Sequence, residues 1–150
     1  MAELHPFFVH FPIAILVVAA LFDVYGVIKN IQQHTWTAYV LQLMAGVSAI
    51  FTAISGNLAE TLVVAQDSLL QGVTASFEKH TSIGNATVWI VILVAVGRTF
   101  AVLEKKEWAL KGWIFPAISL GLALLILITG LLGGVLSRDI LRYFISNYSD

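Results

Sequence analysis

The chain of 150 residues contains no cysteine and few charged residues. The missing cysteine excludes disulfides, thiolate metal sites and iron–sulfur ligation by this chain. Only 11% of the residues are charged, against about 25% in a typical soluble domain. The net charge of −1 gives no electrostatic basis for binding nucleic acid. Hydrolysis has no support either, because the sequence contains no nucleophile–base arrangement, phosphate loop or zinc-hydrolase motif.

Hydrophobic residues make up 59% of the chain and are concentrated in four long segments. A helix needs about 20 apolar residues to cross the hydrocarbon core of a bilayer. The segments of that length cover about residues 8–28, 37–58, 82–103 and 113–135. Trp36, Trp108 and Trp113 fall near segment ends, where an interfacial aromatic belt places them. The sequence therefore predicts an all-α integral membrane protein, a four-helix transmembrane bundle that forms one domain over residues 1–150.

Two further segments mix apolar and polar residues. Residues 59–80 connect the second and third spans, and residues 137–150 form the tail. We expect each to form a short amphipathic helix on the membrane surface. The N-terminus lacks the basic region and small-residue cleavage site of a signal peptide, so we expect the first span to be retained.

Basic residues are distributed unequally between the two membrane faces. The face of the first and third connections holds Lys29, Arg98, Lys105, Lys106 and Lys111, and the opposite face holds Lys79, Arg138 and Arg142. Cytoplasmic loops carry the excess of lysine and arginine. The sequence therefore predicts a multi-pass protein with both termini outside.

Three histidines gather at one membrane face. His5 precedes the first span, His10 lies at its start, and His80 lies at the start of the third span. In a four-span bundle the first and third spans begin on the same side of the membrane. An ionisable residue at the membrane edge is costly and indicates a function. Two imidazoles on different helices can supply both axial ligands of a b-type haem. We predict His10 and His80 as the ligands, with His5 as an accessory group, and interpret His34, at the opposite face, as an interfacial residue.

Glycines lie at the same face as these histidines, namely Gly56, Gly84, Gly130, Gly133 and Gly134. A flat macrocycle approaches a helix backbone closely only where the side chains are small, so we predict Gly84, Gly56, Gly133 and Gly134 in the cofactor site. Tight packing between membrane helices requires the same small residues. The sequence leaves both explanations open.

The spans contain a few other polar residues. Asp23 and Arg98 lie at similar depth near the opposite face. We therefore predict an ion pair, which makes both charges tolerable in lipid. We interpret its role as structural, with a place in a proton path as the alternative. Gln42 can form an interhelical hydrogen bond. Asn57 and Glu60 lie on the histidine face and could fix the tautomer of a histidine ligand.

Hydroxyl groups and one proline complete the local signals. Ser48, Thr52 and Ser55 are interpreted as ordinary residues that hydrogen-bond to carbonyls of their own helix. If the first helix begins at Pro6, Pro12 lies in its interior, removes the N–H that would serve the carbonyl four residues earlier and bends the helix. If the helix begins near residue 11, Pro12 is a favourable first-turn residue.

The opening sequence HPFFVHFPIAIL resembles that of a family of small four-helix bacterial membrane proteins, the predicted-membrane-protein family called domain of unknown function 2231. The resemblance covers nearly the whole chain, and its residues here are His5, Pro6, His10, Phe11, Pro12, His80, Arg98, Gly133 and Gly134. It implies a location in the bacterial inner membrane. Because relatives are fused to or encoded near Rieske and c-type cytochrome domains, it also implies a redox setting.

Together these features favour a membrane-embedded electron-transfer subunit that binds haem b and passes electrons between a quinol, or a redox partner, and another carrier. One alternative is a non-catalytic subunit of a respiratory or photosynthetic complex, whose histidines hold chlorophyll, a lipid head group or nothing. Another is a Cu or Zn site formed by His5, His10 and His80. A four-span chain has little interior, so we expect a lipid bilayer and either other redox subunits or a second copy around it.

Overall fold

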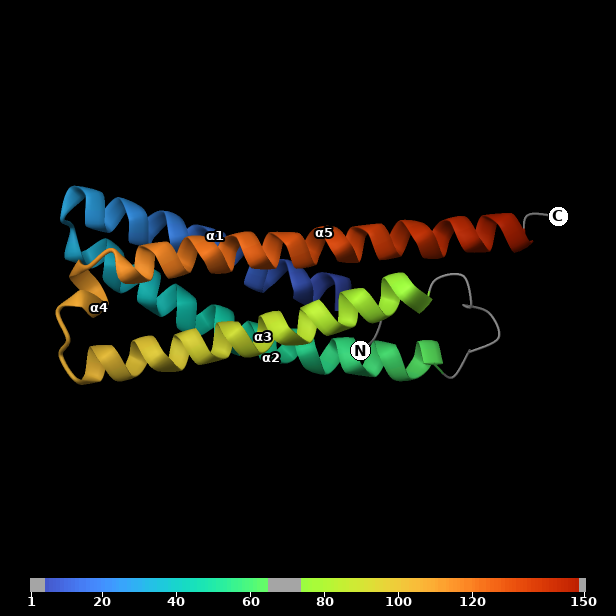
Figure 1. Cartoon of the computed structure of the whole chain (residues 1–150), viewed down its shortest axis with the longest axis horizontal. Helices are drawn as coiled ribbons and strands as arrows, with labels where there is room; N and C mark the ends of the chain where they lie inside the picture. Colours follow the sequence, from blue (N-terminus) through green and yellow to red (C-terminus); the bar gives the residue numbers. More distant parts are fainter. Residues whose placement is uncertain (1–4, 65–73, 149–150) are drawn as a thin grey trace.

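The computed structural model describes residues 5–64 and 74–148, and this part of the chain is folded into helices without any strand. The helices are α1 (His5–Lys29), α2 (Gln32–Val64), α3 (Thr74–Leu103), α4 (Trp108–Lys111) and α5 (Ile114–Tyr148). The four long helices run alongside one another, and the short α4 lies at one end of the bundle (Figure 1). The predicted all-α four-helix architecture is confirmed.

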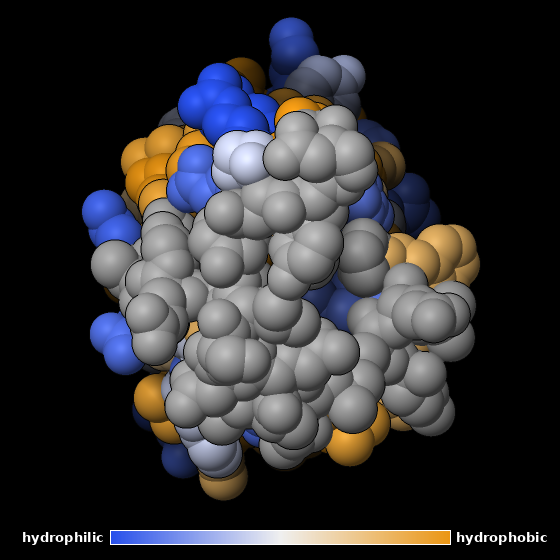
Figure 2. Space-filling view, turned by 90° about the vertical axis from the view of Figure 1, so that its right-hand side faces the viewer, coloured by the Kyte–Doolittle hydropathy of each residue, from blue (hydrophilic) through white to orange (hydrophobic). Residues whose placement is uncertain are grey.

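Within the described residues, four helical segments are long and apolar enough to cross a membrane. They are Phe7–Lys29, Gln32–Leu58, Phe77–Leu103 and Ile114–Arg142. Large apolar side chains point outward along them, for example Leu93 and Leu131, which are 67% and 71% exposed. Seen from the end where α5 projects, hydrophobic patches alternate with hydrophilic residues around the flanks (Figure 2). Such a surface would drive association in water, whereas lipid tails solvate it.

The turn between α1 and α2 is shorter than the sequence suggests, because α2 begins at Gln32. Asn30 takes a left-handed conformation with φ 54°, which asparagine tolerates better than most residues. The N–H of Ile31 then donates to the carbonyl of Gly26 at 2.8 Å. A Cβ on Gly26 would lie 2.8 Å from Cγ2 of Thr35. Glycine at position 26 therefore lets α2 begin close against α1.

The two expected surface helices are replaced, where the structure describes them, by extensions of spanning helices. Helix α2 continues to Val64 and α3 begins at Thr74; residues 65–73 of the predicted connecting helix lie outside the described residues. The tail is not a separate helix, since α5 continues unbroken to Tyr148 and extends beyond the bundle (Figure 1). No glycine or proline follows Gly134 in α5, so nothing in this stretch interrupts the helix.

An apolar belt fills the middle of the bundle. Its buried members come from all four long helices and are Leu16, Ala45, Ala49, Val91, Leu122 and Ile126. Helix α2 contributes only alanines to this set, and small residues let membrane helices pack closely. A second apolar cluster, in which Ala109 and Phe115 are buried, holds α4 against the bundle. The belt separates two groups of polar side chains, one toward each end.

Candidate functional site

A buried ion pair joins α1 and α3 toward the end that carries α4. Arg98 donates from Nη1 to Oδ2 of Asp23 at 2.7 Å and from Nη2 to Oδ1 at 2.6 Å. The Arg98 side chain is 1% exposed and that of Asp23 is fully buried. Two parallel charge-assisted hydrogen bonds are the strongest arrangement open to this pair. The ion pair predicted from the equal depth of the two residues is confirmed.

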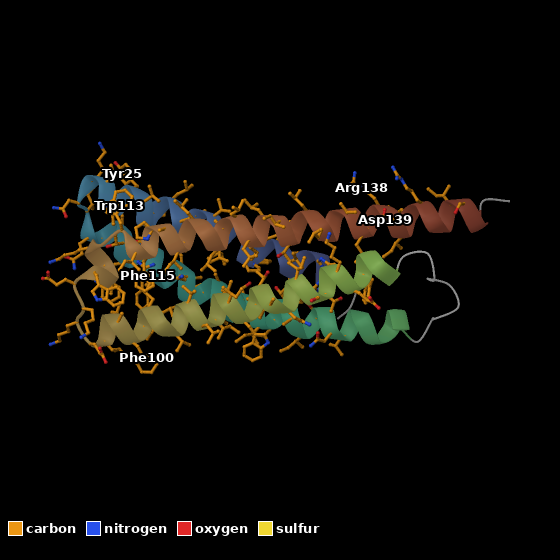
Figure 3. The ribbon with its side chains drawn as sticks, viewed as in Figure 1. Tyr25, Phe100, Trp113, Phe115, Arg138 and Asp139 are labelled. Atoms are coloured by element: carbon orange, nitrogen blue, oxygen red, sulfur yellow. The ribbon has the colours of Figure 1, made fainter. Side chains whose placement is uncertain are left out.

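Residues from the other two long helices complete this ion-pair cluster. Gln42 of α2 accepts a hydrogen bond from Nη1 of Arg98 at 3.1 Å, and Ser119 of α5 donates to Oδ2 of Asp23 at 2.5 Å. The ring of Phe115 lies 4.6 Å from the guanidinium carbon, at the α4 end of the bundle (Figure 3). Opposite charges cancel inside the cluster, so it locks four helices together without a net buried charge. The interhelical hydrogen bond expected of Gln42 is confirmed.

His34 also lies at this end of the bundle. Its ring packs 5.4 Å from the ring of Phe22 and 5.3 Å from that of Tyr25, which is labelled in Figure 3. Both contacts join α2 to α1. The position fits the interpretation of His34 as an interfacial packing residue.

His5 lies at the opposite end of the bundle, in the first turn of α1. Its Nδ1 is 3.0 Å from Oγ of Ser55 on α2. A Cβ on Gly56 would be 3.0 Å from Cε1 of His5, a separation tighter than side chains ordinarily adopt. The imidazole therefore lies against the backbone of α2, in space that the glycine leaves open.

His80 is placed in a similar way between α3 and α5. A Cβ on Gly133 would be 3.0 Å from Cε1 of His80. The Nδ1 atom of His80 is buried and has no hydrogen-bond partner among the described residues. A buried polar atom without a partner costs about 1–3 kcal/mol. The ring of His80 therefore packs closely against the backbone at Gly133, and its Nδ1 forms no hydrogen bond with the described residues.

His5 and His80 are close enough to influence one another's charge. Burial lowers the pKa of His5 below its usual 6.5, the neighbouring His80 lowers it further, and the backbone of Thr52 opposes the shift. His5, which precedes the first membrane-spanning segment, is therefore neutral at pH 7. A neutral imidazole has the free lone pair that a metal ligand requires.

A hydroxyl of α2 compensates for the proline in α1. Helix α1 begins at His5, so Pro12 lies inside it and provides no N–H for the carbonyl of Phe8. The single hydroxyl proton of Thr52 is shared between that carbonyl, 3.0 Å from Oγ1, and the carbonyl of Ser48, 3.1 Å away. The interior position of Pro12 is thus the one adopted. Thr52 ties the histidine-bearing turn of α1 to α2.

The two histidines of the opening motif face different surroundings. His10 is exposed, and the five-residue spacing puts it about 140° around α1 from His5. His5 is half-buried and lies near His80. Within the described residues no three or more potential metal-binding side chains gather, so the expected three-histidine cluster is not formed there. The structure brings together His5 and His80 and leaves His10 on an exposed face.

The remaining predicted site residues are less closely involved. A Cβ on Gly84 would make an ordinary 3.9 Å contact with Thr129, and one on Gly134 would have no neighbour within 4 Å among the described residues. Asn57 is exposed, and the side chain of Glu60 lies outside the described part of the chain. Of the four predicted glycines, only Gly56 and Gly133 lie against a histidine ring.

Thr52 and Ser55 are the contributors that the sequence did not identify. Their hydroxyls do bond within α2 as expected, Ser55 donating to the Thr52 carbonyl at 2.9 Å, but each also reaches α1. For Thr52, the sequence did contain a signal: Pro12 has no N–H for the carbonyl of Phe8, so that carbonyl needs a donor from a neighbouring helix.

Comparison with known proteins gives one family. The family model described as predicted membrane protein (DUF2231) matches residues 2–140. No curated protein and no solved structure matches the chain. The chain therefore belongs to the DUF2231 family of predicted membrane proteins, as its opening motif suggested.

Proposed function

We propose that this member of the DUF2231 family is an electron-transfer subunit that holds a b-type haem with His5 and His80 as axial ligands. One observation carries the proposal. Two half-buried imidazoles from different helices lie near each other at one end of the bundle, and Nδ1 of His80 is buried without a partner. Nε of Arg98 and Nε2 of Gln42 also lack a partner among the described residues, but these nitrogens are donors without a lone pair for a metal, which a neutral imidazole can supply.

The donor set suits haem better than a bare metal ion. A structural or catalytic zinc site takes three or four protein ligands, and no such group occurs within residues 5–64 and 74–148. Haem brings four equatorial ligands of its own and needs at most two axial side chains. When bound, it supplies one-electron redox chemistry. The contribution of the chain is to hold two neutral imidazoles on separate, well-packed helices.

His5 is favoured over His10 as the partner of His80. His5 is half-buried against Gly56 and hydrogen-bonded to Ser55, whereas His10 is exposed. A ligand whose ring is already oriented loses less entropy on binding. The assignment made from the sequence, His10 with His80, remains the competing pair for experiment.

We place the protein in the bacterial inner membrane with the histidine end outside. The distribution of lysine and arginine supports this orientation, and the family resemblance supports the location. Electrons would then be exchanged at the outer face with a quinol or a redox protein. Other redox subunits or a second copy of this chain would cover the exposed apolar helix faces together with lipid.

A difference spectrum of the full-length protein tests the proposal. In membranes from cells with normal haem supply, dithionite-reduced minus oxidised spectra should show a b-type band. We expect His5→Ala and His80→Ala to abolish the band, and the matched control His34→Ala to retain it. Loss in His10→Ala with retention in His5→Ala would restore the ligand pair expected from the sequence. A wild-type protein without the band would reject the function.

A further inference from the structure

The hydroxyl of Ser55 lies between two groups that could compete for its single proton. Oγ of Ser55 donates to the carbonyl of Thr52 at 2.9 Å and is also 3.0 Å from Nδ1 of His5. A hydroxyl has one proton to donate and two lone pairs that accept. Because the carbonyl takes that proton, Ser55 acts as an acceptor toward His5. The shared hydrogen therefore comes from the imidazole. In a neutral imidazole one nitrogen donates and the other accepts, so Nε2 of His5 carries the free lone pair.

We infer that Ser55 is a positioning residue of the haem site: by accepting the Nδ1–H of His5, it leaves Nε2 of that ring to bind iron. The inference rests on the proposed function and adds the group that selects the tautomer of one ligand. Ligating histidines usually donate their second ring N–H to an oxygen, which fixes the ring and raises its basicity. Nδ1 of His80 has no hydrogen-bond partner among the described residues, so no comparable contact selects the tautomer of that ring.

The tautomer is tested first, on the full-length protein without haem. Nitrogen-15 NMR of labelled histidine, at a pH where His5 is neutral, reports which ring nitrogen carries the proton, and His5→Asn identifies the signal. We expect Nδ1 to be protonated in the wild type. In Ser55→Ala the signal should move toward a mixture of tautomers, whereas Ser55→Thr should keep the wild-type pattern. A wild-type ring protonated on Nε2 would overturn the inference.

Haem binding is tested next, with the same variants. Ser48→Ala is the matched control, two turns earlier on α2. We expect Ser55→Ala to bind haem about 10-fold less tightly, or more weakly still. The midpoint potential of the haem that remains should shift to a more positive value, because a less basic ligand stabilises the oxidised iron less. Ser55→Thr should restore both properties.

The outcomes separate the two proposals. If the wild type shows a b-type band and Ser55→Ala behaves like Ser48→Ala in both retention and potential, Ser55 has no positioning role while the proposed function stands. If the wild type shows no band, the proposed function fails, and the role of Ser55 toward iron fails with it. A structural effect alone would lower protein yield without moving the potential.

Discussion

The two polar ends of the bundle differ in the kind of group that they bury and in how those groups are paired. In the ion-pair cluster, Asp23 and Arg98 are 0% and 1% exposed and satisfy one another bidentately. At the histidine end, His5 has one side-chain partner, and Nδ1 of His80 has none among the described residues. Nε of Arg98 and Nε2 of Gln42 are also buried without a partner among the described residues, so an unsatisfied atom alone does not distinguish the two ends. The difference is chemical: guanidinium and amide nitrogens only donate hydrogen bonds, whereas a neutral imidazole also has a lone pair that can bind a metal.

The apolar belt keeps these two ends apart. It consists of alkyl side chains from all four long helices, and the helical rise puts His80 and Arg98 about 27 Å apart along α3. Alkyl groups neither donate nor accept protons, so the belt interrupts a polar path through the bundle interior. The structural interpretation of the Asp23–Arg98 pair is thereby favoured over a role in a proton path.

The largest effect is expected from breaking the ion pair. Asp23→Ala leaves the guanidinium of Arg98 buried without its counter-charge, which costs about 3–5 kcal/mol. The measurement is the free energy of unfolding in detergent or lipid. As control, Glu107→Ala breaks the exposed Lys111–Glu107 pair, which is 3.4 Å long, and should change stability very little. Equal stability of the two variants would contradict the structural role of the cluster.

Thr52→Val tests the link between α1 and α2 at the histidine end. The variant leaves the carbonyl of Phe8 without a donor and should cost about 1–3 kcal/mol. Thr37→Val is the control, because Thr37 is exposed and its hydroxyl donates to the carbonyl of Gln33 in its own helix. In the double variant with Pro12→Ala, residue 12 regains an N–H for Phe8. The cost of Thr52→Val should then fall; an unchanged cost would refute the compensation.

Glycine substitutions test whether the histidine rings need the space they occupy. Gly56→Ala and Gly133→Ala place a Cβ 3.0 Å from a ring carbon of His5 and His80, respectively. We expect each to displace its ring and to lower haem retention several-fold in the difference spectrum. Gly84→Ala, whose Cβ makes an ordinary contact, should retain the band. If all three variants behave alike, the packing of the rings is not important for binding.

The smallest effect is the dependence of stability on pH. Since burial lowers the pKa of His5 below 6.5, the folded protein binds fewer protons than the unfolded chain at and below that pH. The contribution of neutral His5 to the free energy of unfolding is therefore fully present above pH 6.5, and it decreases as the pH falls below that value toward the lowered pKa. The unfolding free energy of His5→Asn should fall less than that of the wild type between neutral and mildly acidic pH. Parallel pH curves would contradict the shift.

The sequence predicted the features that depend on length, depth and charge. Four spans follow from hydrophobic length, and the Asp23–Arg98 pair follows from opposite charges at equal depth. It could not choose between His5 and His10, because that choice depends on where α1 begins and how it is rotated. The roles of Thr52 and Ser55 were hidden for a similar reason: a helical hydroxyl bonds to its own backbone whether or not it also reaches a neighbouring helix.

The central claim is that the histidine end binds a ligand that the ion-pair end does not. The most direct measurement is the reduced-minus-oxidised spectrum of the full-length protein, compared between wild type and His80→Ala in the same membranes. A b-type band in the wild type that disappears in His80→Ala, with the protein still folded and inserted, is the predicted result. A wild type without the band, or an equal band in both proteins, would contradict the claim.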